Sequence, residues 1–461
     1  MNPPKPQRRL SPRLGWPGRR GTRAGRGAAG GGNGRPKIWI GISAGAAVLL
    51  AVGFAGSAIA SPSVTNARSA AATGSAQTMI SGFGCNTATA PGTVHCLGKI
   101  RSHRAHNGRI APDLTSGPVG YGPSDLQSAY KLAGTSGHGR TVAIVDAMDD
   151  PNAQSDLASY RKAYGLPACT TANGCLTKVN QNGKTAPMPA GDYGWAEEIS
   201  LDLDMVSATC PTCHIALVEA NGTDVTSLSK AERTAAAIPG VVAVSNSWGG
   251  SESSSTLAAD SAFQHSGVAV TASSGDSGYS GGVSWPASSR YVTAVGGTSL
   301  SKASNSRGWT ETAWSGSGSG CSANEPKPSW QHDSGCARRT VADVASVADP
   351  NTGVGIYDTY NSCGSSSLCD VEIQLGVAQG LDGWAQVGGT SASSPMIASV
   401  YALAGNTAST VYGSYPYSHR SSLYDVTSGT TGSCSPSYLC TAGPGYDGPT
   451  GLGTPHGTGG F

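Results

Sequence analysis

Residues 388–395 read Gly-Gly-Thr-Ser-Ala-Ser-Ser-Pro and lead directly into the apolar run at 396–404. A serine that follows glycines and precedes such a run is typical of a nucleophile at a loop-to-helix junction. The first turn of a helix offers unpaired N–H groups and the positive end of the helix dipole. Both stabilise an oxyanion that develops during a reaction. Ser391 is therefore the candidate nucleophile, and the open question is which group accepts its proton.

The composition bounds the class of protein. The 461 residues are 38% hydrophobic and only 13% charged, which is enough for one large domain or two smaller ones. The 66 glycines follow no Gly-x-y period, so a collagen-like chain is excluded. The abundance of small residues favours a loop-rich secreted enzyme.

The amino end predicts a targeting segment. Residues 1–37 carry ten Lys and Arg and no acidic residue, and an apolar run extends from Ile38 to Ala60. Small residues at the end of this run indicate signal cleavage before Ser61. The run is also long enough to cross a bilayer, so a retained membrane anchor is the alternative.

Removal of a leader at 1–60 changes the charge of the protein. The remaining residues comprise 20 basic and 28 acidic side chains, a net charge of −8. This negative net charge argues against nucleic-acid binding and is consistent with an enzyme that acts at low pH.

The twelve cysteines fall into six close pairs. With an export signal, six local disulfides are the simplest interpretation. A Cys-x-x-Cys at 210–213 is compatible with a redox or metal site, but no second such motif completes a zinc site. The pairs are Cys85/Cys96, Cys169/Cys175, Cys210/Cys213, Cys321/Cys336, Cys363/Cys369 and Cys434/Cys440.

The pattern beyond the leader predicts two regions. Residues 61–116 are rich in small residues and then basic, as expected of a short pro-segment or linker. From 117 onward, apolar strands alternate with helical segments, which indicates a mostly parallel sheet covered by helices on both faces. The expected strands are 141–145, 215–218, 241–245, 268–272 and 291–295, and the expected helices are 124–130, 196–208, 228–237, 258–265 and 395–404.

The proton acceptor for Ser391 is not a histidine. None of the nine histidines stands in a His-Gly-Thr-His context between Asp146, in Val-Asp-Ala, and the serine. A Gly-Asp-Ser-Gly motif makes Ser277 a second candidate nucleophile, but the all-β pattern and Ala-Ala-His-Cys motif that should accompany it are missing. The sequence therefore argues against a histidine-dependent subtilase, because the histidine base is missing.

Acidic residues occupy the position expected for the base. In the run at 197–204, Glu198 and Asp202 are four residues apart and share a helix face. Two close carboxyl groups do not both ionise easily, so one pKa rises and the pair becomes a base suited to acid. A solvated acidic face, or a pairing of Glu197 with Asp204, is the alternative.

The chain resembles the sedolisin, or serine-carboxyl peptidase, family. The resemblance covers roughly 117–461 and rests on the order of several motifs: Glu-x-x-x-Asp at 198–202, Ser-Asn-Ser-Trp-Gly at 245–249, Ser-Gly-Asp-Ser-Gly at 274–278 and the serine motif at 388–395. Further similar stretches lie at 285–288, 292–298 and 342–350. The resemblance implies a subtilisin-like α/β fold.

The resemblance also implies roles for individual residues. Ser391 is the nucleophile, Glu198 is the general base and then the acid, and Asp202 holds Glu198 and shares its proton. Asp276 stabilises the oxyanion as a protonated acid, and Asp146 extends the carboxyl network. In addition, Trp248 and Gly249 line the substrate cleft.

The family's calcium loop matches the carboxy-terminal region. The resemblance implies one Ca²⁺ held by the carboxylates of Asp425 and Asp447 and by carbonyls of Val426, Gly443 and Gly445. Oxygen ligands suit Ca²⁺. Without the resemblance, the same residues are compatible with a Gly-Pro turn that carries surface acids.

One departure concerns the large amino-terminal prodomain of the family, because only residues 61–116 separate the leader from the catalytic region. The sequence therefore predicts a secreted, monomeric, acid-acting serine endopeptidase with peptide substrates and a peptidase domain at 117–461. A catalytically impaired binding protein on the same fold is the alternative from another class.

Overall fold

The computed structural model describes residues 78–85, 92–364 and 366–461. The predicted leader at 1–60 lies outside the described residues, as does the first part of the predicted pro-segment. Within the described part of the chain, no helix has both the length and the apolar character needed to span a bilayer.

A central sheet positions the site. Six strands run parallel, and β14 closes one edge antiparallel to β13. β17 (Val344–Val347) also pairs in parallel with β13. From edge to edge the sheet contains β14 (Trp309–Ala313), β13 (Thr293–Lys302), β11 (Ala269–Ser273), β9 (Val241–Asn246), β6 (Thr141–Ala147), β8 (His214–Ala220) and β7 (Leu176–Asn180).

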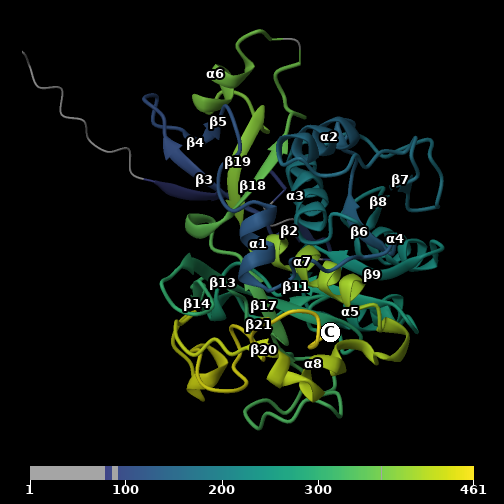
Figure 1. Cartoon of the computed structure of the whole chain (residues 1–461), viewed down its shortest axis with the longest axis vertical. Helices are drawn as coiled ribbons and strands as arrows, with labels where there is room; N and C mark the ends of the chain where they lie inside the picture. The colour runs from purple at the N-terminus through teal and green to yellow at the C-terminus, as the bar shows by residue number, and fades with distance from the viewer. Residues whose placement is uncertain (1–77, 86–91, 365) are drawn as a thin grey trace, which may run out of the picture. The chain divides into compact units, whose positions relative to one another are not determined.

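Helices cover both faces of this sheet. α3 (Tyr193–Thr209) and α7 (Thr390–Ala404) pack against each other and over β6. α4 (Val225–Ala237) packs on β6, β8 and β9 from the other face. α1 (Pro123–Ala129) and α2 (Ala153–Ala163) pack against α3. Figure 1 shows α3 and α7 as neighbours in the middle of the molecule. The predicted α/β subtilisin-like architecture is confirmed.

A second, antiparallel sheet adjoins the serine. β19 (Gly383–Gly388) leads into α7 and pairs with β18 (Val354–Asp358). Its other edge receives strands from residues 79–115, which the sequence assigns to a pro-segment or linker. These strands are β1 (Met79–Gly82), β3 (Lys99–Arg104), β4 (Ile110–Pro112) and β5 (Leu114–Thr115). They lie in the same compact unit as the remaining described residues.

Short elements complete the fold. Three small sheets are formed by β2 (His95–Cys96), β10 (Trp248–Ser251) and β12 (Ser284–Trp285), by β15 (Gly320–Cys321) and β16 (Thr340–Val341), and by β20 (Leu423–Tyr424) and β21 (Thr454–Pro455). The remaining α-helices are α5 (Ser254–Ala259), α6 (Cys369–Gln374) and α8 (Tyr415–Ser418). The helix predicted at 258–265 is instead α5 followed by a 3₁₀ turn, Asp260–Phe263.

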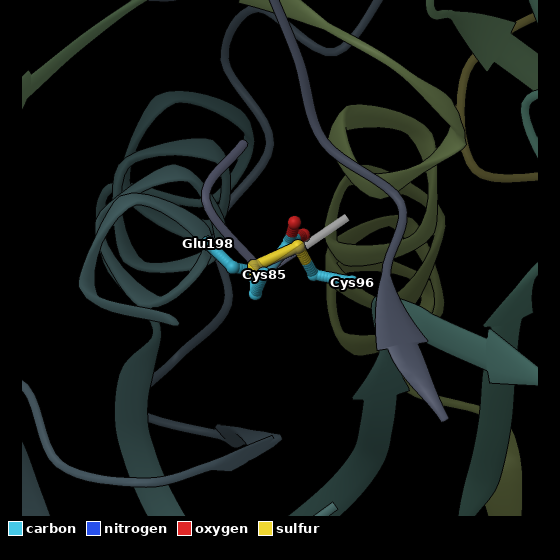
Figure 2. Close-up of side chains that lie close together, drawn as sticks. All are labelled: Cys85, Cys96 and Glu198. Atoms are coloured by element: carbon cyan, nitrogen blue, oxygen red, sulfur yellow. A yellow bond between two sulfur atoms is a disulfide. The ribbon is translucent and has the colours of Figure 1, made fainter. Parts of the chain in front are cut away.

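All twelve cysteines form disulfides, and the six predicted local pairs are confirmed. Cys210 and Cys213 are therefore a short disulfide rather than a metal site. Five of the six pairs close loops within the region 117–461. The sixth, Cys85–Cys96, lies ahead of it in the chain and next to Glu198 of α3 (Figure 2).

Candidate active site

Ser391 occupies the first turn of α7. The helix begins at Thr390, five residues before the predicted start, because Gly389 adopts φ 91° and turns the chain from β19 into the helix. Left-handed φ values favour glycine. Ser391 is fully buried, and its hydroxyl donates to the carbonyl of Ser247 at 3.1 Å. The serine thus lies at the positive end of a 15-residue helix dipole.

Glu198 and Asp202 project from α3 toward this serine. Asp192 caps the helix by accepting from Trp195 N at 2.9 Å, and the four-residue spacing places both carboxyl groups on one face. Both side chains are fully buried. Burial, the neighbouring Asp202 and Asp146 raise the pKa of Glu198 well above its usual value.

The serine lies within electrostatic reach of this carboxyl group. The Ser391 hydroxyl lowers the pKa of Glu198, against the larger raising effects. In the structure this hydroxyl points to Ser247 O, and neither Glu198 oxygen has a hydrogen-bond partner at standard geometry among the described residues. A rotation of the Ser391 side chain would redirect the hydroxyl to Glu198.

Ser247 connects the acid pair to the nucleophile. Its hydroxyl donates to Asp202 Oδ1 at 2.6 Å and also reaches Ser391 O at 3.2 Å. Burial raises the pKa of Asp202 well above its usual value, while this hydrogen bond opposes the rise. In the sequence, Ser247 stands within the Ser-Asn-Ser-Trp-Gly motif, but nothing in that motif alone predicted a role for its hydroxyl.

Asp146 brings a third carboxyl group to the cluster from β6. It is fully buried, and burial raises its pKa to about 8. Neither of its oxygens has a hydrogen-bond partner among the described residues. Because it raises the pKa of both Glu198 and Asp202, it strengthens their tendency to hold protons.

Asp276 lies on the other side of the serine, in the loop after β11. Its Oδ1 accepts both the N–H and the hydroxyl of Thr390 at 2.8 Å. Its Oδ2 is buried without a hydrogen-bond partner among the described residues. Burial raises the pKa of Asp276 to about 6, although Lys99 and Thr390 oppose the shift.

The alternative acid pairing is not formed. Glu197 accepts from Gly84 N at 2.9 Å, whereas Asp204 accepts from Tyr357 N at 3.0 Å. Each therefore has its own backbone partner. Ser277, the alternative nucleophile, lines a cavity of about 140 Å³ together with Asp276.

The predicted cleft residues belong to β10. The side chain of Trp248 is fully buried against Phe263 and Trp285, and its Nε1 donates to Val145 O at 2.8 Å. The side chain therefore lies in the core. Gly249 continues the same strand toward a cavity of about 140 Å³ that also borders Asp276.

Two of the predicted calcium residues, Asp425 and Asp447, are neighbours in the structure. Asp447 is fully buried, and its Oδ2 accepts from Gly443 N at 3.1 Å. Asp425 accepts from Gly445 N at 2.8 Å. Burial raises the pKa of Asp447 to about 7, and the charge of Asp425 adds to the rise. Asp447 Oδ1 also accepts from Thr450 N and Oγ1 at 2.9 Å, and the two acids, for which the described part of the chain supplies no ion pair, are compatible with a cation.

A buried serine beside buried carboxyl groups on a subtilisin-like α/β fold is the arrangement typical of serine-carboxyl peptidases. Kumamolisin from Bacillus sp. (strain MN-32) is 30% identical over 396 residues, covering 77% of this chain and 65% of kumamolisin. Sedolisin from Pseudomonas sp. (strain 101) is 28% identical over 388 residues, covering 75% and 61%. The chain thus spans less than two thirds of the length of these curated relatives.

A solved structure agrees with these matches. Pseudomonas sedolisin, a serine-carboxyl proteinase complexed with two molecules of pseudo-iodotyrostatin, superposes with a TM-score of 0.59 at 27% identity, covering 74% of this chain and 96% of that one. No family model matches the chain. The chain belongs to the sedolisin family.

Proposed function

We propose that this protein is a secreted serine-carboxyl endopeptidase that hydrolyses peptide bonds in acid. The observation that carries the proposal is the convergence of Ser391, Glu198 and Asp202 in one buried cluster, with Asp276 held next to the serine through Thr390. A buried nucleophile beside coupled carboxyl groups has its base ready without a histidine.

The proposed reaction moves one proton through Glu198. Ser391 Oγ attacks the peptide carbonyl carbon as Glu198 takes the hydroxyl proton. The protonated Oδ2 of Asp276 donates to the oxyanion of the tetrahedral intermediate. The C–N bond then breaks, and Glu198 gives its proton to the leaving amine. Water hydrolyses the acyl-enzyme by the reverse sequence.

Asp202 and Ser247 position the base in this scheme. Asp202 shares the proton of the pair, so that Glu198 and Asp202 together carry one negative charge. The hydroxyl of Ser247 fixes Asp202 Oδ1 at 2.6 Å. Asp146 adds a further carboxyl group to the cluster. Because Asp146 holds its proton, it adds no second negative charge.

Acid operation follows from these charges. Asp276 donates a hydrogen bond only while it is protonated, and its pKa of about 6 limits that state to acidic and near-neutral solution. A rise in pH also ionises the carboxyl cluster, whose charged form is disfavoured by burial. Activity should therefore decline as the pH rises through about 6.

We further propose one Ca²⁺ at the carboxy-terminal loop. Carboxylates of Asp425 and Asp447 and carbonyls of Val426, Gly443 and Gly445 would hold it. The bound cation would neutralise the two facing acids and stabilise the loop, without taking part in the reaction.

The organisation of the full protein follows the same proposal. Residues 1–60 form the leader, 61–116 a pro-segment and 117–461 the peptidase domain. Proteins or peptides are the substrates, and the enzyme works as a monomer outside the cell. Burial of both carboxyl groups beside the serine favours an enzyme over a binding protein on the same fold.

The direct test compares the parent protein with Ser391→Ala and Glu198→Gln for cleavage of a denatured protein near pH 4. Glu198→Gln is isosteric and Ser391→Ala removes a single oxygen atom, so a folding defect is not expected. The proposal requires activity in the parent and a loss of at least 10³-fold in each variant. Activity in Glu198→Gln would disprove the assigned base, and an inactive parent would favour the binding protein.

A further inference from the structure

A second cavity, separate from the one that borders Asp276, lies in the carboxy-terminal part of the protein. Its volume is about 800 Å³, within the range of roughly 300–1,000 Å³ that is usual for small-molecule sites. Its walls come from residues 330–334 between β15 and β16, residues 414–420 around α8, and residues 438–452. None of the described residues that line it belongs to the proposed catalytic groups.

Aromatic rings form a continuous wall of this cavity. Ring centroids lie 4.7 Å apart for Trp330 and Tyr417, 6.1 Å for Tyr417 and Tyr446, and 6.3 Å for Tyr446 and Tyr438. Successive ring planes are inclined by 53°, 33° and 57°, so the wall is curved. Tilted contacts of this kind are favourable between aromatic groups. A further aromatic ring in the cavity would therefore meet ring faces and edges on more than one side.

The hydroxyl groups of the three tyrosines are used within the protein. They donate to Asp343 Oδ1 from Tyr417 at 2.8 Å, to Ala342 O from Tyr446 at 2.9 Å and to Asp333 Oδ2 from Tyr438 at 2.7 Å. The rings thus present mainly carbon atoms to the cavity. A ligand covered with hydroxyl groups, such as a sugar, would bury polar groups without partners here, which is unfavourable.

Two disulfides hold the aromatic wall in place. Cys321–Cys336 closes the loop that carries Trp330, and Cys434–Cys440 closes the loop that carries Tyr438. Gly335 N donates to the Tyr438 hydroxyl at 2.8 Å and joins the two loops. A cavity that is fixed before a ligand arrives loses less conformational freedom on binding.

The uncompensated charge of the cavity is positive. Asp333 is an acid that lines it, but Lys327 Nζ pairs with Asp333 Oδ1 at 2.9 Å. Arg420 is exposed at the cavity and makes no ion pair and no side-chain hydrogen bond within the described part of the chain. His332, which is also exposed at the cavity, can only add positive charge. A free guanidinium beside an apolar wall is suited to a carboxylate.

We propose that this cavity binds a carboxylate that carries one or more aromatic rings, with the rings against Trp330 and Tyr446 and the carboxylate on Arg420. A peptide that ends in an aromatic residue and a free aromatic acid share this chemistry. The ring contacts would bury most of the apolar area of the ligand. The paired hydrogen bonds of guanidinium and carboxylate would fix its orientation.

The experiment uses the full chain with Ser391→Ala, so that no peptide probe is hydrolysed. Isothermal titration calorimetry at about pH 6, where a free carboxyl group is ionised, compares N-acetyl-Phe-Phe with its carboxamide. We expect the acid to bind at least about 10-fold more tightly, because the amide has no charge for Arg420.

A third probe, biphenyl-4-carboxylate, distinguishes the two sources of this chemistry. Affinity equal to that of N-acetyl-Phe-Phe would show that an aromatic acid is sufficient. Affinity at least about 10-fold weaker, but still above that of the carboxamide, would identify a peptide terminus, whose backbone adds hydrogen bonds. Both results agree with the proposal.

Two changes at exposed positions locate the bound probe. Arg420→Gln removes the charge, and Ser418→Trp places an indole in the cavity; each should weaken binding of N-acetyl-Phe-Phe at least about 10-fold. The control for the first is Arg338→Gln, an exposed arginine that does not line the cavity. The control for the second is Ser409→Trp, because the hydroxyls of Ser409 and Ser418 both donate to the carbonyl three residues before them. Both controls should bind within about twofold of the Ser391→Ala protein.

Three results would overturn the proposal. The first is equal binding of the acid and the carboxamide. The second is undiminished binding after Arg420→Gln and after Ser418→Trp, which would place the probe elsewhere, for example in the catalytic cleft. The third is tighter binding of glucuronate or cellobiose than of N-acetyl-Phe-Phe, which would identify a sugar site. Each result is independent of whether the parent protein hydrolyses peptides.

Discussion

Asp276 is tied to the residue immediately before the nucleophile, because its Oδ1 accepts both the N–H and the hydroxyl of Thr390 at 2.8 Å. This double hydrogen bond fixes the orientation of the carboxyl group. The proton is then best placed on Oδ2, which has no partner of its own among the described residues and faces Leu97 O.

This orientation predicts different outcomes for two substitutions. Asp276→Ala removes the oxyanion donor and should lower kcat by roughly 10²–10³-fold. Asp276→Asn keeps an acceptor for Thr390 and an N–H donor that does not titrate. It should therefore lose less activity, and its activity should persist above pH 6. The measurement is kcat between pH 3 and 8 for both variants; equal losses at every pH would contradict a donor role.

The hydroxyl of Ser247 should influence the titration of the acid pair. Ser247→Ala deprives buried Asp202 of its 2.6 Å hydrogen bond, which costs about 1–3 kcal/mol if the carboxylate stays ionised. The pKa of Asp202 should rise further, and kcat should fall about tenfold with an altered pH profile. Ser245→Ala is the matched control, because its buried hydroxyl bonds Ser394 instead. An unchanged profile in Ser247→Ala would remove Ser247 from the positioning of the base.

Buried carboxyl groups should make the fold sensitive to alkali. Burial raises the pKa of Asp276 to about 6, of Asp150 to about 7, and of Asp146 and Glu197 to about 8. A raised folded-state pKa favours the protonated fold, so this stability is complete below about pH 4 and is lost as the pH rises through 6–8. The Tm of Ser391→Ala, which avoids autolysis, should fall by on the order of 10 °C between pH 5 and 8. A Tm that rises over this range would show that these acids are not protonated in the fold.

Calcium should stabilise the protein most at neutral pH. The pKa of Asp447 is raised to about 7, so protons compete with the cation below that value. Calcium at 100-fold its Kd should stabilise the fold by about 2.7 kcal/mol near neutrality and less at pH 4. Asp447→Asn should abolish the gain in Tm, whereas the exposed Asp370→Asn should not. If chelation leaves the Tm of the parent unchanged, the loop does not bind calcium.

The positions of the acid pair on α3 and of the serine at the start of α7 were predictable because local rules govern them. A spacing of four residues brings Glu198 and Asp202 to one face of any helix, and coupling between their charges in the structure agrees with that geometry. The glycine pair before Ser391 likewise predicted the junction at the start of α7. In both cases the signal lies within a few residues.

The strands before the peptidase domain could not be predicted in this way. β2 has two residues and pairs with β10, more than 150 positions away in the chain. Such strands are too short for a period of two to appear, and their partners are set by the tertiary fold. Nothing near Leu97 in the sequence indicated that its carbonyl would lie beside Asp276.

A serine activated by carboxyl groups is tested most sharply by the pH dependence of peptide cleavage by the parent protein, with Ser391→Ala and Glu198→Gln measured beside it. We expect maximal cleavage below about pH 5, a decline as Asp276 ionises near pH 6, and near-complete loss in both variants. Maximal cleavage near pH 8, or substantial cleavage by Glu198→Gln, would contradict a serine activated by carboxyl groups.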